Sequence, residues 1–392
     1  MKPVSTNINQ QSQRRKSKKT ILKRILLYFV VLLALVGLTA VLVINLNPAF
    51  GGNLTKEQKQ AYKKYANFVD GKFVNLEPTD INFTLADSIS MIRDSINGGT
   101  ELEPTGTLPV VPLDWDKIRS EEDSLTWFGH SAFLVSLDNK KILVDPMLSL
   151  RSSPVSFVGG STRYTGSILD IIDDMPTIDA VFLTHDHYDH LDYSSILKLK
   201  NKTNHFFVPL GVSNHLIRWG VPEEDITELG WWDETEYEGL KVVFTPSQHM
   251  SGRGPFNGDT TLWGSWVMLG QNTRFYTSGD GGYGNHFKEI GQRYGPFDIA
   301  LIEGGQYDER WRKIHMVPEE SLQAQKDLGA KNMMLIHWAG FTLAYHGWTE
   351  PIERAIRAAE KENVNLVAPQ IGETLSLQGE LSFPITHWWN ER

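Results

Sequence analysis

The residues best suited to chemistry lie together in one segment, Thr-His-Asp-His-Tyr-Asp-His at positions 184–190. Three imidazoles and two carboxylates follow directly on the apolar run 178–183. Clustered titratable groups resist burial unless a cation holds them together, and a metal ion is the natural cation. Imidazole and carboxylate ligands without thiolate suit zinc, and also manganese or iron. The segment therefore predicts a metal site on a loop that follows a buried strand.

The spacing within this segment indicates more than one ion. In an extended or looped backbone His185 and His187 can point the same way, while Asp189 and His190 fall on the next bend. One loop can thus provide ligands to two adjacent metal ions. The alternative is a solvated, histidine-rich loop without metal, and the position directly after an apolar strand argues against it.

The segment 185–190 resembles the signature of the metallo-β-lactamase-fold hydrolases. Asp145 to Pro154, Leu262 to Trp266 and Ile336 to Trp338 resemble the N-acylphosphatidylethanolamine-hydrolysing phospholipase D branch of that family. The likeness runs from about Trp115 to about Gly372. It implies an α/β fold, a four-layer αβ/βα metallo-β-lactamase-type sandwich, that holds two Zn²⁺ ions.

Three further candidate ligands follow apolar runs in the same manner as the central segment: His249, Asp280 and His337. Rigid strands that deliver side chains to one sheet edge hold ions in place. The family pattern, carried over to this chain, implies seven ligands: His185, His187 and His249 for one zinc ion, Asp189, His190 and His337 for the other, and Asp280 as the bridge between them.

The resemblance also implies a mechanism. Two ions about 3.5–4 Å apart lower the pKa of a shared water and stabilise charge on the attacking and leaving oxygens. Such a site suits in-line attack on a phosphodiester, and also attack on a lactone or amide carbonyl. Because the chain shows no separate Ser-His-Asp signature, the expected nucleophile is a metal-bridging hydroxide, with Asp280 or a zinc-bound water passing a proton to the leaving alkoxide.

Four residues around the central segment are candidates for supporting roles. Asp186 is expected to orient a histidine, with a solvated loop carboxylate as the alternative. His130 and His315 match family histidines near the metals, where each can contact substrate or serve only as a hydrogen-bonding or capping residue. Arg253, on a glycine-rich loop, can contact an anionic head group. The predicted catalytic set is therefore Asp280, Asp186 and His315, and the predicted substrate-binding set is His130, Arg253 and His315.

The charge of the 392-residue chain is unevenly distributed. Residues 1–24 hold eight Lys or Arg and no acid, and the remainder carries 30 basic against 47 acidic residues, a balance of −17. An acidic catalytic part argues against nucleic acid as a partner, because phosphate backbones need a basic footprint. The absence of cysteine excludes disulfides and thiolate metal sites.

The N-terminal region predicts a membrane anchor. Residues 25–44 are twenty uncharged, mostly apolar positions, enough to span a hydrocarbon layer of about 30 Å. A secretory signal peptide is the alternative, but its apolar core is normally only about 7–15 residues long. The basic flank places the N-terminus in the cytoplasm and the rest of this single-pass membrane protein on the extracytoplasmic side.

The chain divides into four expected parts. They are a basic, disordered tail (1–24), the transmembrane anchor (25–44), a linker and covering segment (45–108) and the hydrolase domain (109–392). The covering segment shows no chemistry, although Thr55 to Gln58 resembles a capping box that opens a helix to about Phe68.

Short apolar runs separated by turns predict the elements of the hydrolase domain. A hairpin is expected from the runs 131–136 and 141–145. Further strands are predicted over 205–209, 240–245, 262–269, 274–277, 299–302, 333–336 and 365–367, and helices over 193–200, 318–328 and 351–363. Many strands with interleaved helices favour two sheets packed face to face with helices outside.

The favoured function is a membrane-anchored di-zinc hydrolase that cleaves phosphodiester bonds of (N-acyl)phosphatidylethanolamine-type phospholipids in a phospholipase D-like reaction. One alternative is a hydrolase of a small soluble phosphodiester or a sugar lactone, since lactonase-like relatives keep a similar metal loop. A non-catalytic zinc-binding membrane scaffold is a further alternative, which the intact ligand set disfavours. A homodimer is an open expectation.

Overall fold

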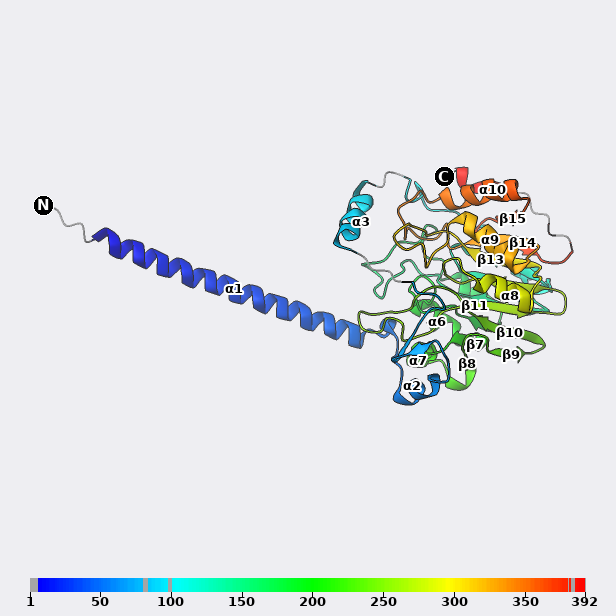
Figure 1. Ribbon diagram of the computed structural model, residues 1–392, viewed down its shortest axis with the longest axis horizontal. Helices are drawn as coiled ribbons and strands as arrows, with labels where there is room; N and C mark the ends of the chain where they lie inside the picture. Colours follow the sequence, from blue (N-terminus) through cyan, green and yellow to red (C-terminus); the bar gives the residue numbers. More distant parts are fainter. Residues whose placement is uncertain (1–5, 80–83, 98–100, 380, 382–384, 392) are drawn as a thin grey trace. The chain divides into compact units, whose positions relative to one another are not determined.

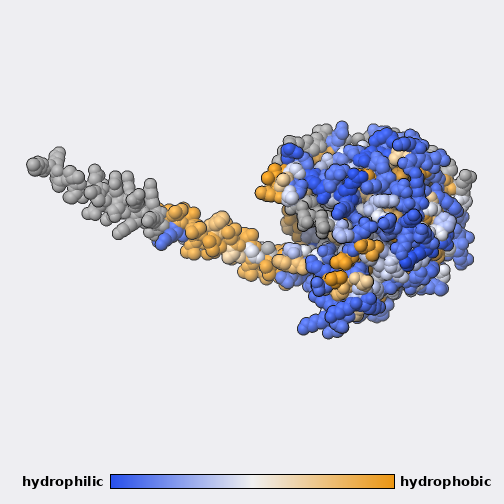
Figure 2. Space-filling model, viewed as in Figure 1, coloured by the Kyte–Doolittle hydropathy of each residue, from blue (hydrophilic) through white to orange (hydrophobic). Residues whose placement is uncertain are grey.

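The computed structural model describes residues 6–79, 84–97, 101–379, 381 and 385–391, which form two units divided after Phe50 (Figure 1). In the first unit, helix α1 (Thr6–Leu46) is followed by a short 3₁₀ turn (Pro48–Phe50). Ile21–Leu46 has a mean hydropathy of 2.9 and is long and apolar enough to cross a membrane. Figure 2 shows this apolar surface in orange.

The expectation of a disordered tail over residues 1–24 is wrong from Thr6 onward, where α1 begins. The Gln, Arg and Lys residues of this stretch have high helix propensity, so they extend the apolar helix toward the N-terminus. Residues 1–5 lie outside the described part. The candidate span is also longer than the predicted 25–44.

The second unit contains two seven-stranded sheets. The first runs in spatial order through β16 (Thr374–Ser376), β3 (Ser124–Trp127), β4 (Phe133–Leu137), β5 (Lys140–Val144), β6 (Ile178–Phe182), β7 (Thr203–Pro209) and β8 (Ile226–Leu229). The second runs through β15 (Asn365–Val367), β14 (Asn332–Ile336), β13 (Ile299–Glu303), β12 (Arg274–Thr277), β11 (Ser265–Leu269), β10 (Leu240–Thr245) and β9 (Glu234–Tyr237). Each sheet is antiparallel at one end and parallel at the other.

Helices cover the outer face of each sheet. Over the first sheet lie α4 (Trp115–Ser120), α5 (Ile171–Asp174), α6 (Tyr193–Leu199) and α7 (Ser213–Arg218), which share a buried apolar cluster with it. Over the second lie α8 (His286–Tyr294), α9 (Pro318–Leu328) and α10 (Glu350–Glu362), side by side in Figure 1. This arrangement confirms the predicted four-layer αβ/βα sandwich.

The main core lies between the two sheets, where aromatic rings meet across the interface. The ring centroids of Phe133 and Phe275 are 5.8 Å apart, and those of Phe182 and Trp266 are 4.9 Å apart in an edge-on contact. Strands β4, β13 and β14 are buried along their whole length. Burial of both faces explains their nearly continuous apolar sequences and why they could be predicted.

The predicted strands and helices of the hydrolase domain are confirmed, some with the predicted bounds and others with ends shifted by a few residues. Strand β11 begins at Ser265 instead of position 262, because the N–H groups of Leu262 and Gly264 donate to Leu210 and Thr184 of the other sheet's loops. The sequence does not predict β8 and β9, edge strands whose acidic residues make them resemble loops.

The covering segment is more structured than its pattern indicated. Helix α2 (Lys56–Tyr62) begins with the predicted capping box at Thr55 but ends before Phe68. A small hairpin, β1 (Phe68–Val69) and β2 (Lys72–Phe73), then places Phe68 and Phe73 in the main core. Helix α3 (Leu85–Asn97) was not predicted.

Candidate metal centre

The seven predicted ligands converge at one edge of the sandwich. The loop after β6 carries His185 to His190, and single residues follow β10, β12 and β14. The carboxyl ends of strands β6, β12 and β14 in the parallel parts of both sheets face this edge, so short loops suffice to bring the side chains together.

Three histidines form the first half of the cluster. His185 Nε2 lies 3.0 Å from His187 Nδ1, and His249 Nε2 lies 3.2 Å from the same nitrogen. These three nitrogens all lie within 4.8 Å of one another and can hold one metal ion.

The second half joins Asp189, His190 and His337. The Asp189 carboxylate oxygen Oδ2 is 3.3 Å from His337 Nε2 and 3.5 Å from His190 Nε2. Asp280 Oδ2 lies 3.1 Å from each of these two Nε2 atoms. It also lies 3.8 Å from Nε2 of His185 and of His249, so Asp280 stands between the two halves.

The hydrogen bonds behind the rings fit metal binding. The Ile314 carbonyl can only accept, so His249 Nδ1, 3.1 Å away, carries the hydrogen and its Nε2 keeps a lone pair. The Asp145 carboxylate acts in the same way on His190 Nδ1 at 2.8 Å. His190 Nε2 and Asp280 Oδ1 are buried and have no hydrogen-bond partner among the described residues. Such converging acceptors call for a divalent cation.

The pKa shifts of the histidines differ between the two halves of the cluster. Burial and the neighbouring imidazoles hold the pKa of His185 and His249 well below 6.5, so these rings are neutral, as a histidine that binds metal must be. Burial also opposes charge on His190 and His337, but the nearby carboxylates, Asp280 foremost, raise the pKa of both well above 6.5. Protons on these two rings occupy the place that a bound cation takes when it displaces them.

Asp186 lies behind the loop, facing away from the metal cluster. It is fully buried, and its carboxylate is 3.2 Å from His215 Nε2. It also accepts hydrogen bonds from Gly252 N at 2.7 Å and Thr261 Oγ1 at 2.9 Å. Asp186 therefore ties the metal loop to the segment after His249, and the histidine beside it is not one of the seven candidate ligands.

The prediction that Arg253 contacts substrate is wrong. Its side chain is only 2% exposed, and Nη1 donates to the carbonyls of Asp186 (2.6 Å) and Leu191 (2.8 Å). The guanidinium lies 4.0 Å from the centroid of the Tyr188 ring. Arg253 thus holds the loop 184–190 through hydrogen bonds on the side away from the cavity. The glycine-rich sequence around Arg253 did not indicate this role.

The same correction applies to His130 as a substrate contact. Its ring is completely buried, and Nε2 lies 2.9 Å from Asp189 Oδ2.

His130, Asp145 and His337 all adopt positive φ values, of 57°, 42° and 68°. Left-handed backbone at non-glycine residues carries strain that the surrounding structure must hold, and here it aims side chains at the cluster.

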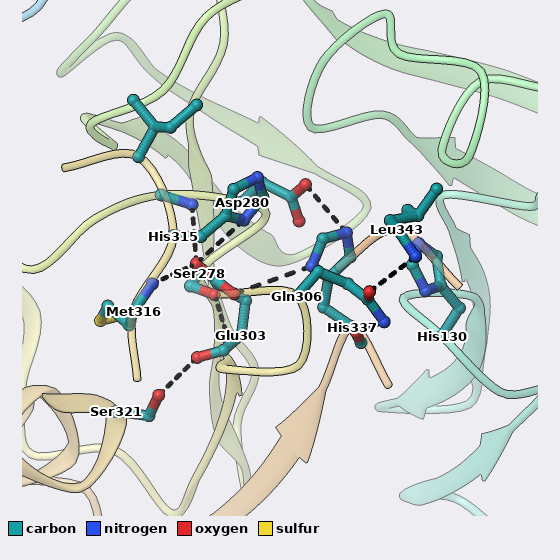
Figure 3. Close-up of polar contacts among 12 residues, drawn as sticks. His130, Ser278, Asp280, Glu303, Gln306, His315, Met316, Ser321, His337 and Leu343 are labelled. Carbon is teal, nitrogen blue, oxygen red and sulfur yellow. Dashed lines mark hydrogen bonds and ion pairs between the residues drawn. The ribbon is translucent and has the colours of Figure 1, made fainter. Parts of the chain in front are cut away.

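A cavity of about 460 Å³ opens over the cluster. Candidate ligands and His315 form its floor, and Met250, Trp311, Ile314 and Leu343 provide apolar walls. His315 thus lines this cavity, and its contact with substrate stays a prediction. Figure 3 shows His315, Asp280 and His337 around a further acid, Glu303, at the end of β13.

Two residues beside the cluster were not predicted. Glu303 ends an apolar run in the same way as the ligands, a signal present in the sequence but unused. Asn75 belongs to the covering segment, and no local pattern marks it. It becomes visible only because tertiary folding places it against His249.

Comparison with known proteins identifies the family and two similar sequences. Residues 140–338 match the Beta-lactamase superfamily domain. An uncharacterised protein of Mycobacterium tuberculosis is 37% identical over 329 residues, or 82% of this chain and 87% of that protein. The N-acyl-phosphatidylethanolamine-hydrolyzing phospholipase D 1 of Caenorhabditis elegans is 34% identical over 250 residues, or 60% of this chain and 70% of that protein.

One solved structure shows the same fold. Isothiocyanate hydrolase from Delia radicum gut bacteria superposes with a TM-score of 0.52 at 22% identity, covering 64% of this chain and 98% of that chain. At this level of identity the likeness concerns the architecture alone.

Proposed function

Because the chain belongs to the β-lactamase superfamily of metal-dependent hydrolases, we propose that it hydrolyses phosphodiester bonds of membrane phospholipids. The substrate class is N-acylphosphatidylethanolamine-type lipid, and the reaction is phospholipase D-like. Water adds to phosphorus, the bond to the ethanolamine-type alcohol breaks, and the products are phosphatidate and an N-acylethanolamine.

One observation carries this proposal: an apolar-walled cavity lies directly on the His/Asp cluster. Met250, Trp311 and Leu343 offer a surface for acyl or glyceryl carbon, and the cluster beneath them suits a phosphate. Three large apolar side chains at the rim of the cavity favour a lipid substrate over a polar sugar lactone. The similarity to the Caenorhabditis elegans phospholipase supports the same substrate class.

We assign two zinc ions to the cluster, because nitrogen and oxygen ligands without sulfur suit that metal. His185, His187 and His249 would hold one, Asp189, His190 and His337 the other, and Asp280 would contact both. Bound cations there supply charge neutralisation for the phosphate and a lowered pKa for water.

The chain's own residues contribute orientation and proton handling. Asp280 Oδ1 is buried and without a hydrogen-bond partner among the described residues, so it can take a proton from water and pass it toward the leaving oxygen. His315 lines the cavity and is placed to hydrogen-bond bound substrate.

The candidate span in α1 supports a membrane-anchored enzyme. The basic residues before it support a cytoplasmic N-terminus with the hydrolase domain, residues 109–392, on the extracytoplasmic side. An anchored domain meets bilayer lipid at high local concentration, in keeping with a phospholipid substrate.

The test is product analysis combined with metal analysis. Full-length protein is incubated with vesicles that contain N-acylphosphatidylethanolamine, and mass spectrometry is expected to find phosphatidate and N-acylethanolamine in equal amounts. Asp189→Ala should retain about one zinc ion per chain instead of two and lose nearly all turnover. Asp116→Ala, whose side chain is 93% exposed on α4, is the matched control.

Two results would contradict the proposal. Wild-type protein that binds no transition metal under zinc-replete conditions would remove the metal centre. Inert vesicles together with rapid turnover of a soluble phosphodiester or a sugar lactone would keep the metal centre and replace the substrate.

A further inference from the structure

Glu303 is a fully buried carboxylate at the end of β13, next to the metal cluster. Its Oε1 accepts hydrogen bonds from Met316 N at 2.9 Å and Gly281 N at 3.4 Å. No Lys or Arg of the described residues forms an ion pair with it. A buried carboxylate without a cationic partner is costly, so its retention at this place requires a reason.

Two imidazoles face this carboxylate from the cavity side (Figure 3). His315 Nδ1 lies 3.4 Å from Oε1, and His337 Nδ1 lies 3.7 Å from Oε2. The two rings are stacked, with centroids 5.1 Å apart and planes 7° apart. The Nδ1 atoms of both rings and Oε2 are buried, and none of the three has a hydrogen-bond partner elsewhere among the described residues.

We propose that Glu303 is a positioning residue that holds the Nδ1 hydrogens of His337 and His315 at once. A carboxylate only accepts hydrogen bonds, so each Nδ1 that faces it carries a hydrogen. Nε2 of His337, 3.1 Å from Asp280 Oδ2, is then left with a lone pair for a cation. Nε2 of His315 is held in one orientation toward the cavity. One residue thus couples a metal ligand to a cavity-lining residue.

His337 differs from the other histidines in needing this partner. His190 has Asp145 behind its ring, and His249 has the Ile314 carbonyl. His337 Nδ1 has no hydrogen-bond partner of this kind among the described residues, and the carboxylate of Glu303 lies 3.7 Å from it. Groups that fix the tautomer of a ligand histidine typically change metal affinity by about 10–100-fold.

Glu303→Gln separates this role from a purely structural one. The glutamine carbonyl can keep the bonds from Met316 N and Gly281 N that close the local fold. Its amide NH₂ then faces His337 Nδ1 and donates to it, which favours a hydrogen on Nε2, the tautomer that cannot bind metal. Glu309→Gln, the same change at an 81% exposed side chain nearby, is the matched control.

The experiment measures zinc affinity of the full-length protein by chelator competition. This inference rests on the metal centre proposed above. Glu303→Gln is expected to bind one of two zinc ions at least about 10-fold more weakly, with a lower kcat, a raised KM and an unchanged melting temperature of the metal-free protein. Glu309→Gln should match the wild type. Two ions bound by Glu303→Gln with wild-type affinity would overturn the inference, whereas wild-type protein without metal would overturn the metal centre itself.

A second measurement needs no variant. ¹⁵N NMR of the zinc-loaded wild-type protein distinguishes the histidine tautomers. Hydrogens on Nδ1 of both His315 and His337 support the inference. A hydrogen on Nε2 of His337, or an Nδ1 of His315 without hydrogen, contradicts it.

Discussion

Asn75 holds both backbone polar groups of His249. Its Nδ2 donates to the His249 carbonyl at 2.7 Å, and the His249 N–H donates to Asn75 Oδ1 at 3.0 Å. The same Oδ1 accepts from Trp263 Nε1 at 3.0 Å. A residue of the covering segment therefore fixes the backbone from which a candidate ligand projects, although 174 positions separate the two residues.

Asn75→Ala should weaken metal binding and turnover together. The substitution leaves the N–H and the carbonyl of His249 without the partner that Asn75 provides, whereas Trp263 Nε1 keeps its hydrogen bond to the Ser247 carbonyl at 3.2 Å. An unsatisfied group of this kind typically lowers the free energy of unfolding by about 1–3 kcal/mol. Because His249 loses its brace, we expect zinc affinity to fall by about 10-fold. Chelator competition and thermal melts measure both effects. Asn272→Ala, at an exposed asparagine, is the control, and unchanged zinc affinity in Asn75→Ala would show that the bond is dispensable.

Arg253→Met should lower stability rather than substrate affinity. It removes the donor to the Asp186 and Leu191 carbonyls beneath the metal loop. We expect a loss of about 2–4 kcal/mol in unfolding free energy, measured by urea denaturation, with KM for vesicle lipid unchanged. Arg119→Met, at an exposed arginine paired with Asp116, should change stability by no more than about 0.5 kcal/mol. Wild-type stability with a raised KM in Arg253→Met would restore the substrate-binding role.

His286 should make the protein acid-sensitive. Burial lowers the pKa of this histidine at the start of α8 from 6.5 to about 3. Below pH 6.5, His286 is therefore protonated in the unfolded chain but stays neutral in the folded protein. The free energy of unfolding thus falls as the pH drops from 6.5 toward 3. The loss from this one group reaches about 1.4 kcal/mol per pH unit.

His286→Gln tests this through the difference between two stability curves, which cancels the titration of the metal cluster. Its unfolding free energy relative to the wild type should rise steadily as the pH is lowered from 7 to 5. A pH-independent difference for His286→Gln would show that His286 has the same pKa in the folded and the unfolded protein, which would contradict the prediction.

Removal of residues 1–50 should affect lipid substrates alone. The remaining residues form a separate compact unit that contains the whole cluster. Turnover of soluble bis-p-nitrophenyl phosphate should stay the same, while the rate on vesicles should fall by about 10-fold or more because the tether no longer concentrates enzyme at lipid. Full-length protein in detergent micelles serves as the reference. Equal vesicle rates would mean that the anchor plays no part in substrate access.

The sequence alone determined the fold family, the αβ/βα architecture, the candidate span and the set of candidate ligands. These features depend on local sequence patterns. Buried strands appear as apolar runs, and the candidate ligands follow these runs directly in the chain. The edge strands β8 and β9, in which acidic residues interrupt the apolar pattern, lacked such a signal.

The tertiary structure decided which side chains serve the site from behind. His130, Asp186 and Arg253 were all placed near the centre by sequence, yet only burial and hydrogen-bond partners show that they brace the loop without reaching the cavity. Glu303 ends an apolar run as the candidate ligands do, but its role depends on His315 and His337, which only the fold places beside it. Asn75 has no local signal, because its partner His249 lies 174 positions away in the chain. Hydrogen bonds between distant segments depend on three-dimensional proximity, which no local sequence pattern encodes.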